Sequence, residues 1–159
     1  MTNIPKFEYL KKEFNKIDNL FKSNKFDSVI EKSKKILKKY PEQTPFYNFI
    51  GLSYRQMGNF LLAEEILKNG LDIKPNDENL LINLGSTYRG MIKFKKSEVY
   101  LKQALNINGN NVNALINYGN LKRDMNEIIE ATKLYEKAHT LGANNSTINI
   151  NLAGIYQIN

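Results

Sequence analysis

The chain has 159 residues, and 42% of them are hydrophobic, which is typical of one folded domain and leaves no room for a disordered half. It has no cysteine, so disulfide bonds and thiolate metal sites are excluded. The net charge is +7, no apolar run is long enough to span a membrane, and residues 1–16 lack the apolar centre of a signal peptide, so we predict a cytoplasmic protein.

The first predicted helix pair lies in residues 10–43, the most basic part of the chain. Residues 1–43 hold eleven lysines and six acidic residues. Five lysines crowd the last turns of the second helix: Lys32, Lys34, Lys35, Lys38 and Lys39. Cations at a helix C-terminus are favourable by about 0.3 to 1 kcal/mol each, so we interpret the segment as a solubilising cap on the end of the fold. Nucleic acid or an anionic membrane is the less favoured partner, because no nucleic-acid motif accompanies the charge.

The second predicted helix pair lies in residues 44–77. Thr44 is expected to be the N-cap and Pro45 the first helical residue, where its missing N–H is not needed. Gly58 should end this helix, because glycine readily takes a positive φ. The second helix should stop before Pro75, since the residue before a proline disfavours the helical conformation.

The same plan repeats every 34 residues through residues 78–111 and 112–145, without an insertion or a deletion. Asp77 or Asn79, and Asn111 or Asn113, are expected near the helix starts. A small residue recurs at one offset: Gly51, Gly85, Gly119 and Ala153. A fixed period of this length is typical of stacked helical hairpins, each too small to bury its own apolar face.

Residues 146–159 begin a further repeat, and its first helix is expected to be apolar over more of its circumference than an end helix should be. Two interpretations stay open. The sequence is an excerpt from a longer protein, which we favour, or this face pairs with a second copy to form a homodimer.

The slots of residues 44–77 resemble the tetratricopeptide repeat (TPR) signature one by one: Tyr47, Ile50, Gly51, Tyr54, Ala63, Leu67 and Pro75. Residues 78–111 and 112–145 repeat the pattern, with Lys122 in a tyrosine slot, and residues 10–43 match it as a degenerate first repeat. The resemblance implies an all-α fold, a right-handed superhelical solenoid of antiparallel helix pairs that forms a single domain over residues 1–159.

An asparagine ladder stands in phase with these repeats at Asn83, Asn117 and Asn151. Each side chain should project away from the second helix of its pair. The resemblance implies that this direction is the concave side of the solenoid. An amide can pair with the N–H and C=O groups of an extended peptide, and it can equally bond its counterpart on the next helix. We include Asn48 and Asn120 among the candidate peptide-binding residues.

The only three arginines, Arg55, Arg89 and Arg123, form a second ladder of the same period. Lysine outnumbers arginine twenty to three, so the pattern favours planar, bidentate donors for a carboxylate or phosphate on the partner. The alternative is pairing with glutamates of an adjacent helix, worth about 0 to 1 kcal/mol per exposed pair. The candidates are Glu64, Glu65 and Glu98, which we expect to lie on a solvent-facing surface.

Different groups of TPR domains bind different ligands, and their ligand-binding positions show which group this chain resembles. TPR domains that hold the acidic tails of heat-shock chaperones use a clamp of two lysines, two asparagines and an arginine. Asn83 fits one position, but the expected lysines and arginine fall on Asn48, Asn113 and Asn117, and the other asparagine on Leu52. We therefore do not expect chaperone-tail binding. The asparagine ladder looks more like the TPR region of O-linked N-acetylglucosamine transferases and of bacterial sugar or sulfate transferases.

The sequence predicts a non-enzymatic scaffold that binds an extended, acidic or phosphorylated peptide through both ladders. The alternative is the substrate-recruiting part of a larger glycosyl- or sulfotransferase. No glycine-rich phosphate loop or catalytic triad is present, and no cofactor or metal is expected. The sole histidine, His139, is expected to be a partly buried packing residue.

Overall fold

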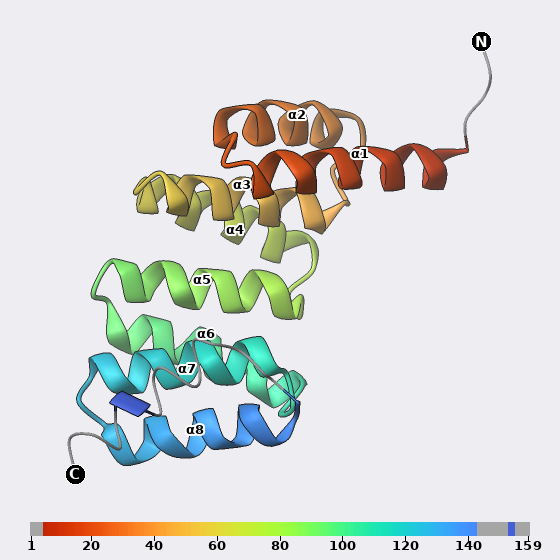
Figure 1. Ribbon diagram of the computed structural model, residues 1–159. Helices are drawn as coiled ribbons and strands as arrows, with labels where there is room; N and C mark the ends of the chain where they lie inside the picture. Colours follow the sequence, from red (N-terminus) through yellow and green to blue (C-terminus); the bar gives the residue numbers. More distant parts are fainter. Residues whose placement is uncertain (1–4, 143–152, 155–159) are drawn as a thin grey trace. The chain divides into compact units, whose positions relative to one another are not determined.

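The computed structural model describes residues 5–142 and 153–154 (Figure 1). This part of the chain holds eight α-helices and no strand, which confirms the predicted all-α fold. The helices are α1 (Lys6–Lys22), α2 (Phe26–Lys39), α3 (Thr44–Gln56), α4 (Phe60–Ile73), α5 (Glu78–Gly90), α6 (Phe94–Ile107), α7 (Val112–Asp124) and α8 (Ile128–Thr140). Among the described residues, no helix combines the length and apolarity that crossing a membrane requires.

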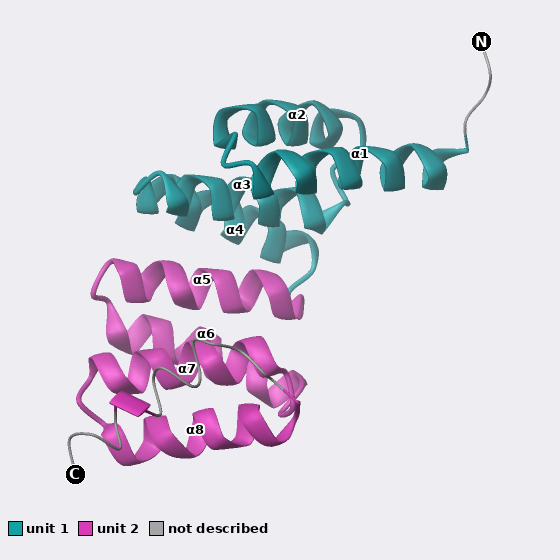
Figure 2. Cartoon of the chain, in the orientation of Figure 1, with its two compact units in different colours: residues 1–75 teal, residues 76–159 magenta. Residues whose placement is uncertain are grey.

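The helices fall into two compact units, residues 1–75 and residues 76–159 (Figure 2). In the first unit α3 packs against α4 and α2, and in the second unit α5 packs against α6 and α7 against α8. Consecutive helices therefore form antiparallel pairs, as the repeat period predicts. Asn151 and the segment 146–159 of the expected homodimer interface lie outside the described residues, apart from Ala153 and Gly154.

Helix starts follow local hydrogen-bond chemistry in the second unit. The Asp77 carboxylate accepts from the N–H of Leu80 at 3.3 Å, and the Asn111 amide oxygen accepts from the N–H of Ala114 at 3.0 Å. Both bonds satisfy N–H groups that a helix start leaves unpaired. The predicted cap at Thr44 is wrong by one residue, because Thr44 is itself helical and Gln43 precedes it without a side-chain cap.

The turns inside the pairs repeat one backbone conformation. Asn24, Gly58, Ile92 and Asn126 all have positive φ, between 56° and 77°, at intervals of 34 residues. The next N–H reaches back to a carbonyl in the last helical turn, as from Asn59 to Tyr54 at 2.8 Å. This bond is the Schellman closure, for which glycine is the favoured residue. The predicted stop at Gly58 is confirmed, while Ile92 adopts the same φ in spite of its branched Cβ.

The recurring glycines lie where the two helices of a pair approach most closely. A Cβ built on Gly51 would lie 2.6 Å from Leu67, and one on Gly119 would lie 2.6 Å from the Tyr135 ring. Real Cβ atoms do not approach so closely, so the side chains of the second helix occupy the space that glycine leaves. The period-34 small residue is thus a packing requirement of the helix pair.

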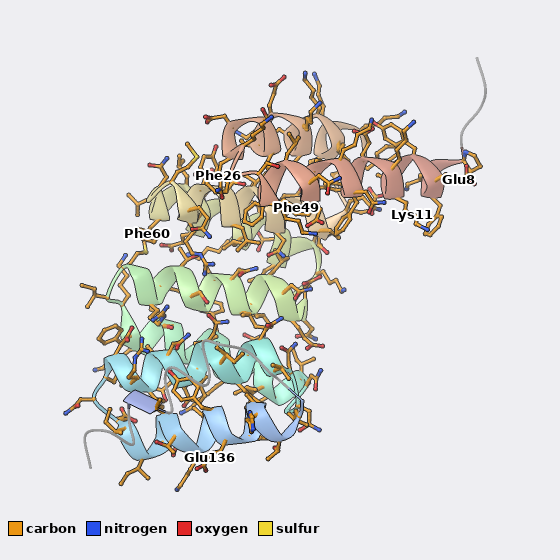
Figure 3. All side chains as sticks on the ribbon, in the orientation of Figure 1. Glu8, Lys11, Phe26, Phe49, Phe60 and Glu136 are labelled. Carbon is orange, nitrogen blue, oxygen red and sulfur yellow. The ribbon has the colours of Figure 1, made fainter. Side chains whose placement is uncertain are left out.

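Each unit has its own apolar core. In the first unit the rings of Phe14 and Phe21 pack on Phe49, with centroids 5.1 and 6.2 Å away. Phe49 is labelled in Figure 3. In the second unit α7 and α8 bury Leu115 and Tyr135. His139 is exposed, so the expectation that it is a partly buried packing residue is wrong.

Candidate peptide-binding surface

The first helices of the two pairs in the second unit, α5 and α7, are in contact. Three side-chain links join them, and we call this set the α5–α7 seam. The links are Asn111 Nδ2 to Glu78 Oε2 at 2.6 Å, Ser86 Oγ to Asn117 Oδ1 at 2.7 Å, and Arg89 Nη1 to Asp124 Oδ2 at 2.8 Å. Two of the predicted binding residues, Asn117 and Arg89, take part in these links.

Asn117 is half-buried and bonded within the fold on both sides of its amide. Its oxygen accepts from Ser86, and its Nδ2 donates to the carbonyl of Asn113 at 2.8 Å. Asn117 therefore joins α5 and α7 through Ser86, whereas the bridging interpretation expected its partner to be the counterpart asparagine. These bonds use one of two N–H groups and one of two oxygen lone pairs.

The other candidate asparagines lie in different surroundings. Asn120 on α7 is half-buried, and its oxygen accepts from the Tyr135 hydroxyl at 2.8 Å. Asn83 on α5 is half-buried, and its backbone carbonyl accepts from Thr87. Asn48 is half-buried on α3 in the first unit. The structure thus brings Asn83, Asn117 and Asn120 onto neighbouring helices and describes Asn48 in a separate unit.

Two of the three arginines meet at one carboxylate. Asp124 accepts from Arg89 through one oxygen at 2.8 Å and from Arg123 through the other at 3.4 Å. All three side chains keep between 28% and 40% of their surface exposed, so the group is reachable from solvent. Arg55 is half-buried on α3 in the first unit. Sequence reasoning missed Asp124, although it directly follows Arg123 in the chain.

Glu98 was expected to face solvent. It lies instead in a network of side chains on α6, α7 and the turn before α8. It accepts from the Tyr118 hydroxyl at 2.8 Å and pairs with Lys102 at 2.9 Å and Lys122 at 3.0 Å. Lys122 also pairs with Glu127 at 2.7 Å. The signal in the sequence was the lysine in an aromatic slot, because a buried ammonium group needs acidic partners.

The network shifts the acidity of its members. The hydrogen bond from Lys102, with those from Lys122 and Tyr118, lowers the pKa of Glu98 to about 2. Burial alone would lower the pKa of Lys122, but the bonds to Glu127 and Glu98 outweigh it and raise that pKa. Burial and the bond to Glu98 raise the pKa of Tyr118. The ion pair between Lys122 and Glu98 therefore stays fully charged at neutral pH.

The comparisons with known proteins agree with this architecture. The tetratricopeptide repeat family model matches residues 44–77 and 79–111. A search of curated proteins found no match. Among solved structures, a thermophilic TPR protein of Thermus thermophilus, TTC0263, is similar at a TM-score of 0.82 and 19% identity, over 91% of this chain and 80% of that chain.

Two further solved structures share the fold. MamA is similar at a TM-score of 0.68 and 22% identity, over 87% of this chain and 83% of that chain. The first TPR of Spaghetti (RPAP3), solved with the HSP90 peptide SRMEEVD bound, is similar at a TM-score of 0.67 and 25% identity, over 73% of this chain and 92% of that chain. Residues 44–77 and 79–111 are therefore tetratricopeptide repeats, in an all-α helical repeat fold that this chain shares with solved TPR proteins.

Proposed function

We propose that this chain is a protein-interaction scaffold that binds an extended peptide along the α5–α7 seam. The observation that carries the proposal is the row of partly exposed amide and guanidinium groups on two consecutive first helices: Asn83, Arg89, Asn117 and Arg123. A similar TPR domain was solved with a peptide bound, which supports the class of ligand.

The bonds inside the seam are compatible with this role. Asn117 has one N–H and one lone pair beyond its bonds to Ser86 and Asn113. Those two internal bonds fix the rotamer of the amide before a ligand arrives. A side chain that is already oriented loses less entropy on binding, which favours affinity for a peptide backbone.

The acidic tails of heat-shock chaperones are not the proposed ligand. The clamp positions that such tails require carry Asn48, Leu52, Asn113 and Asn117 in this chain. The peptide SRMEEVD is the ligand of the RPAP3 domain, and the residues of the present chain favour a different peptide. Along the seam, amide groups would hold the backbone, and arginines would select an acidic or phosphorylated group.

The decisive experiment separates ligand contact from internal bridging. Peptides are selected from a random library displayed on phage, and the affinity of the best peptide is measured by calorimetry for each variant. Asn83→Ala with Asn117→Ala should weaken binding by about tenfold or more, because each lost hydrogen bond is worth about 0.5 to 1.5 kcal/mol.

Ser86→Ala is the matched control. It removes the same internal bond from Asn117 but leaves both amides in place. Its affinity for the peptide should fall by much less than that of the double asparagine variant, because it loses only the prior orientation of Asn117 and keeps both amides. Circular dichroism should confirm equal helix content. If Ser86→Ala and the double asparagine variant weaken binding equally, or if neither does, the asparagines are braces and the proposed surface is wrong.

The alternative function is the substrate-recruiting part of a glycosyl- or sulfotransferase. The resemblance of the asparagine spacing to such TPR regions supports it, and the peptide contacts would be the same. A catalytic motif in sequence continuous with this chain would favour this alternative. Further repeats there would favour the scaffold.

A further inference from the structure

Asp124 lies between two guanidinium groups of the arginine ladder. Its two carboxylate oxygens accept from different guanidinium groups, Arg89 Nη1 at 2.8 Å and Arg123 Nη2 at 3.4 Å. Arg89 comes from the last turn of α5, whereas Arg123 and Asp124 end α7. One carboxylate of the protein thus lies between the two positive groups that sequence reasoning assigned to a partner.

The observed pairing leaves Arg89 far from its full donor capacity. Only its Nη1 is bonded to Asp124, and its Nε is shielded from solvent without a hydrogen-bond partner. A guanidinium group binds a carboxylate best through two parallel N–H bonds from one planar edge. Asp124 does not make that bidentate contact with Arg89, so the observed pair falls short of the strongest geometry.

The charges and the repeat pattern point the same way. The two guanidinium groups share the Asp124 carboxylate, so neither has that partner to itself. Gln56 and Gly90 stand at the offset of Asp124 in the preceding repeats, so the helix-pair fold does not require an acid there. The aspartate is a feature of the last arginine of the series alone.

We propose that Arg89 and Arg123 form a binding site for a carboxylate of an acidic partner peptide, and that Asp124 occupies this site as a competing carboxylate in the unliganded protein. This inference rests on the proposed function, since both arginines lie on the helices that carry Asn83 and Asn117. Partly exposed ion pairs contribute little free energy, so an incoming carboxylate can displace Asp124 at low cost. An acidic segment of the partner then binds by displacing Asp124, whereas a neutral segment cannot displace it.

The test uses a defined probe in place of the unknown partner. The probe is a blocked tetraglutamate peptide, and the matching tetraglutamine peptide reports binding that does not depend on charge. Affinities are measured by titration of amide NMR spectra of the full chain. If Asp124 occupies the site about nine-tenths of the time, Asp124→Asn should raise the affinity for tetraglutamate about tenfold, with no change for tetraglutamine. The gain should shrink as salt is added, because the site is partly exposed.

Glu64→Gln is the matched control, because it removes one negative charge from a different ion pair, Glu64–Lys68, which lies within α4. It should leave the affinity for tetraglutamate unchanged. Arg89→Gln combined with Asp124→Asn should abolish the gain. Asp124→Ala, a second removal of the carboxylate, should reproduce the effect of Asp124→Asn if the gain comes from opening the site.

Equal or weaker binding of tetraglutamate by both Asp124 variants, with unchanged helix content, would overturn the inference and leave Asp124 as a brace of the seam. A gain of the same size in Glu64→Gln would also overturn it, since net charge alone would explain the result. The asparagine test of the proposed function does not involve Asp124. A gain in Asp124→Asn together with a failed asparagine test would therefore support the carboxylate site and reject the peptide-backbone contacts.

Discussion

Two consecutive helix pairs of the second unit fill the same slot with opposite chemistry. In α5 the slot holds Tyr88, which is 1% exposed and stacks on Tyr100 with ring centroids 5.5 Å apart. In α7 it holds Lys122, which is 7% exposed and pairs with Glu98 and Glu127. One helical turn earlier the order is reversed, with Leu84 in α5 and Tyr118 in α7. In α7 the aromatic residue therefore lies one turn earlier than in α5, and a charged network fills the slot that Tyr88 fills in α5.

The comparison shows that the fold specifies a filled volume at this slot and leaves its chemistry open. An aromatic ring fills it with dispersion and apolar burial, whose contribution does not depend on charge. A lysine fills it only if its ammonium group is paired, which makes the second pair depend on three or more ionised side chains. The two solutions should therefore respond differently to truncation, acid and backbone change.

Truncation should separate the two slots most strongly. We expect Tyr88→Ala to lower the free energy of unfolding by about 3 to 5 kcal/mol, because it opens a cavity in a closed core. Lys122→Ala should cost about 1 to 3 kcal/mol, since Glu98 keeps Lys102 and the Tyr118 hydroxyl as partners. Urea unfolding at neutral pH measures both. A loss for Lys122→Ala as large as that for Tyr88→Ala would mean that the ion pairs outweigh the aromatic packing.

Acid should weaken the charged slot alone. The pKa of Glu98 is lowered in the folded protein to about 2 from its ordinary 4.5, so its contribution is complete above pH 4.5 and is lost as pH falls from there toward 2. We expect a loss of about 1 to 3 kcal/mol in the free energy of unfolding over this window.

The control for acid is Glu98→Gln, which cannot ionise at this position. Its stability should be lower at neutral pH and should fall less steeply with acid than that of the unsubstituted protein, as followed by urea unfolding at several pH values. Parallel pH profiles for the two proteins would show that other carboxylates, such as the exposed Glu42, cause the acid sensitivity.

The glycines offer the smallest and sharpest contrast. A Cβ on Gly85 would meet Leu101 at 2.7 Å, and one on Gly119 would meet the Tyr135 ring at 2.6 Å. A leucine branch can rotate aside, whereas the Tyr135 ring is rigid and its hydroxyl is bonded to Asn120. Thermal unfolding should show Gly119→Ala destabilising by about 1 to 2 kcal/mol and Gly85→Ala by less. The reverse order would mean that the tyrosine has room to shift.

The sequence predicts the helix ends well where local chemistry decides them. Gly58 and Pro75 mark the ends of α3 and α4, and Asp77 and Asn111 cap the next first helices, because each acts on backbone groups a few residues away. Thr44 has the right residue type but lies inside its helix by one position. A boundary error of this size is common, since neighbouring residues compete for the cap.

The partners of the candidate site are beyond the reach of the sequence. The period places Asn117 and Arg89 on their helices, but it does not say that Ser86 bonds the first or that Asp124 pairs with the second. These partners lie 31 and 35 residues away and depend on how α5 and α7 pack. The burial of Lys122 has the same origin, because Glu98 reaches it from a different helix 24 residues earlier.

The α5–α7 seam has a mechanical consequence. A single contact between two helices would act as a pivot, but links near both ends and in the middle block rotation and sliding together. The spacing between the amide groups of α5 and α7 is then fixed. A flexible peptide bound along the proposed surface would have to match this spacing, so the rigid seam would restrict the backbone conformation of the bound peptide.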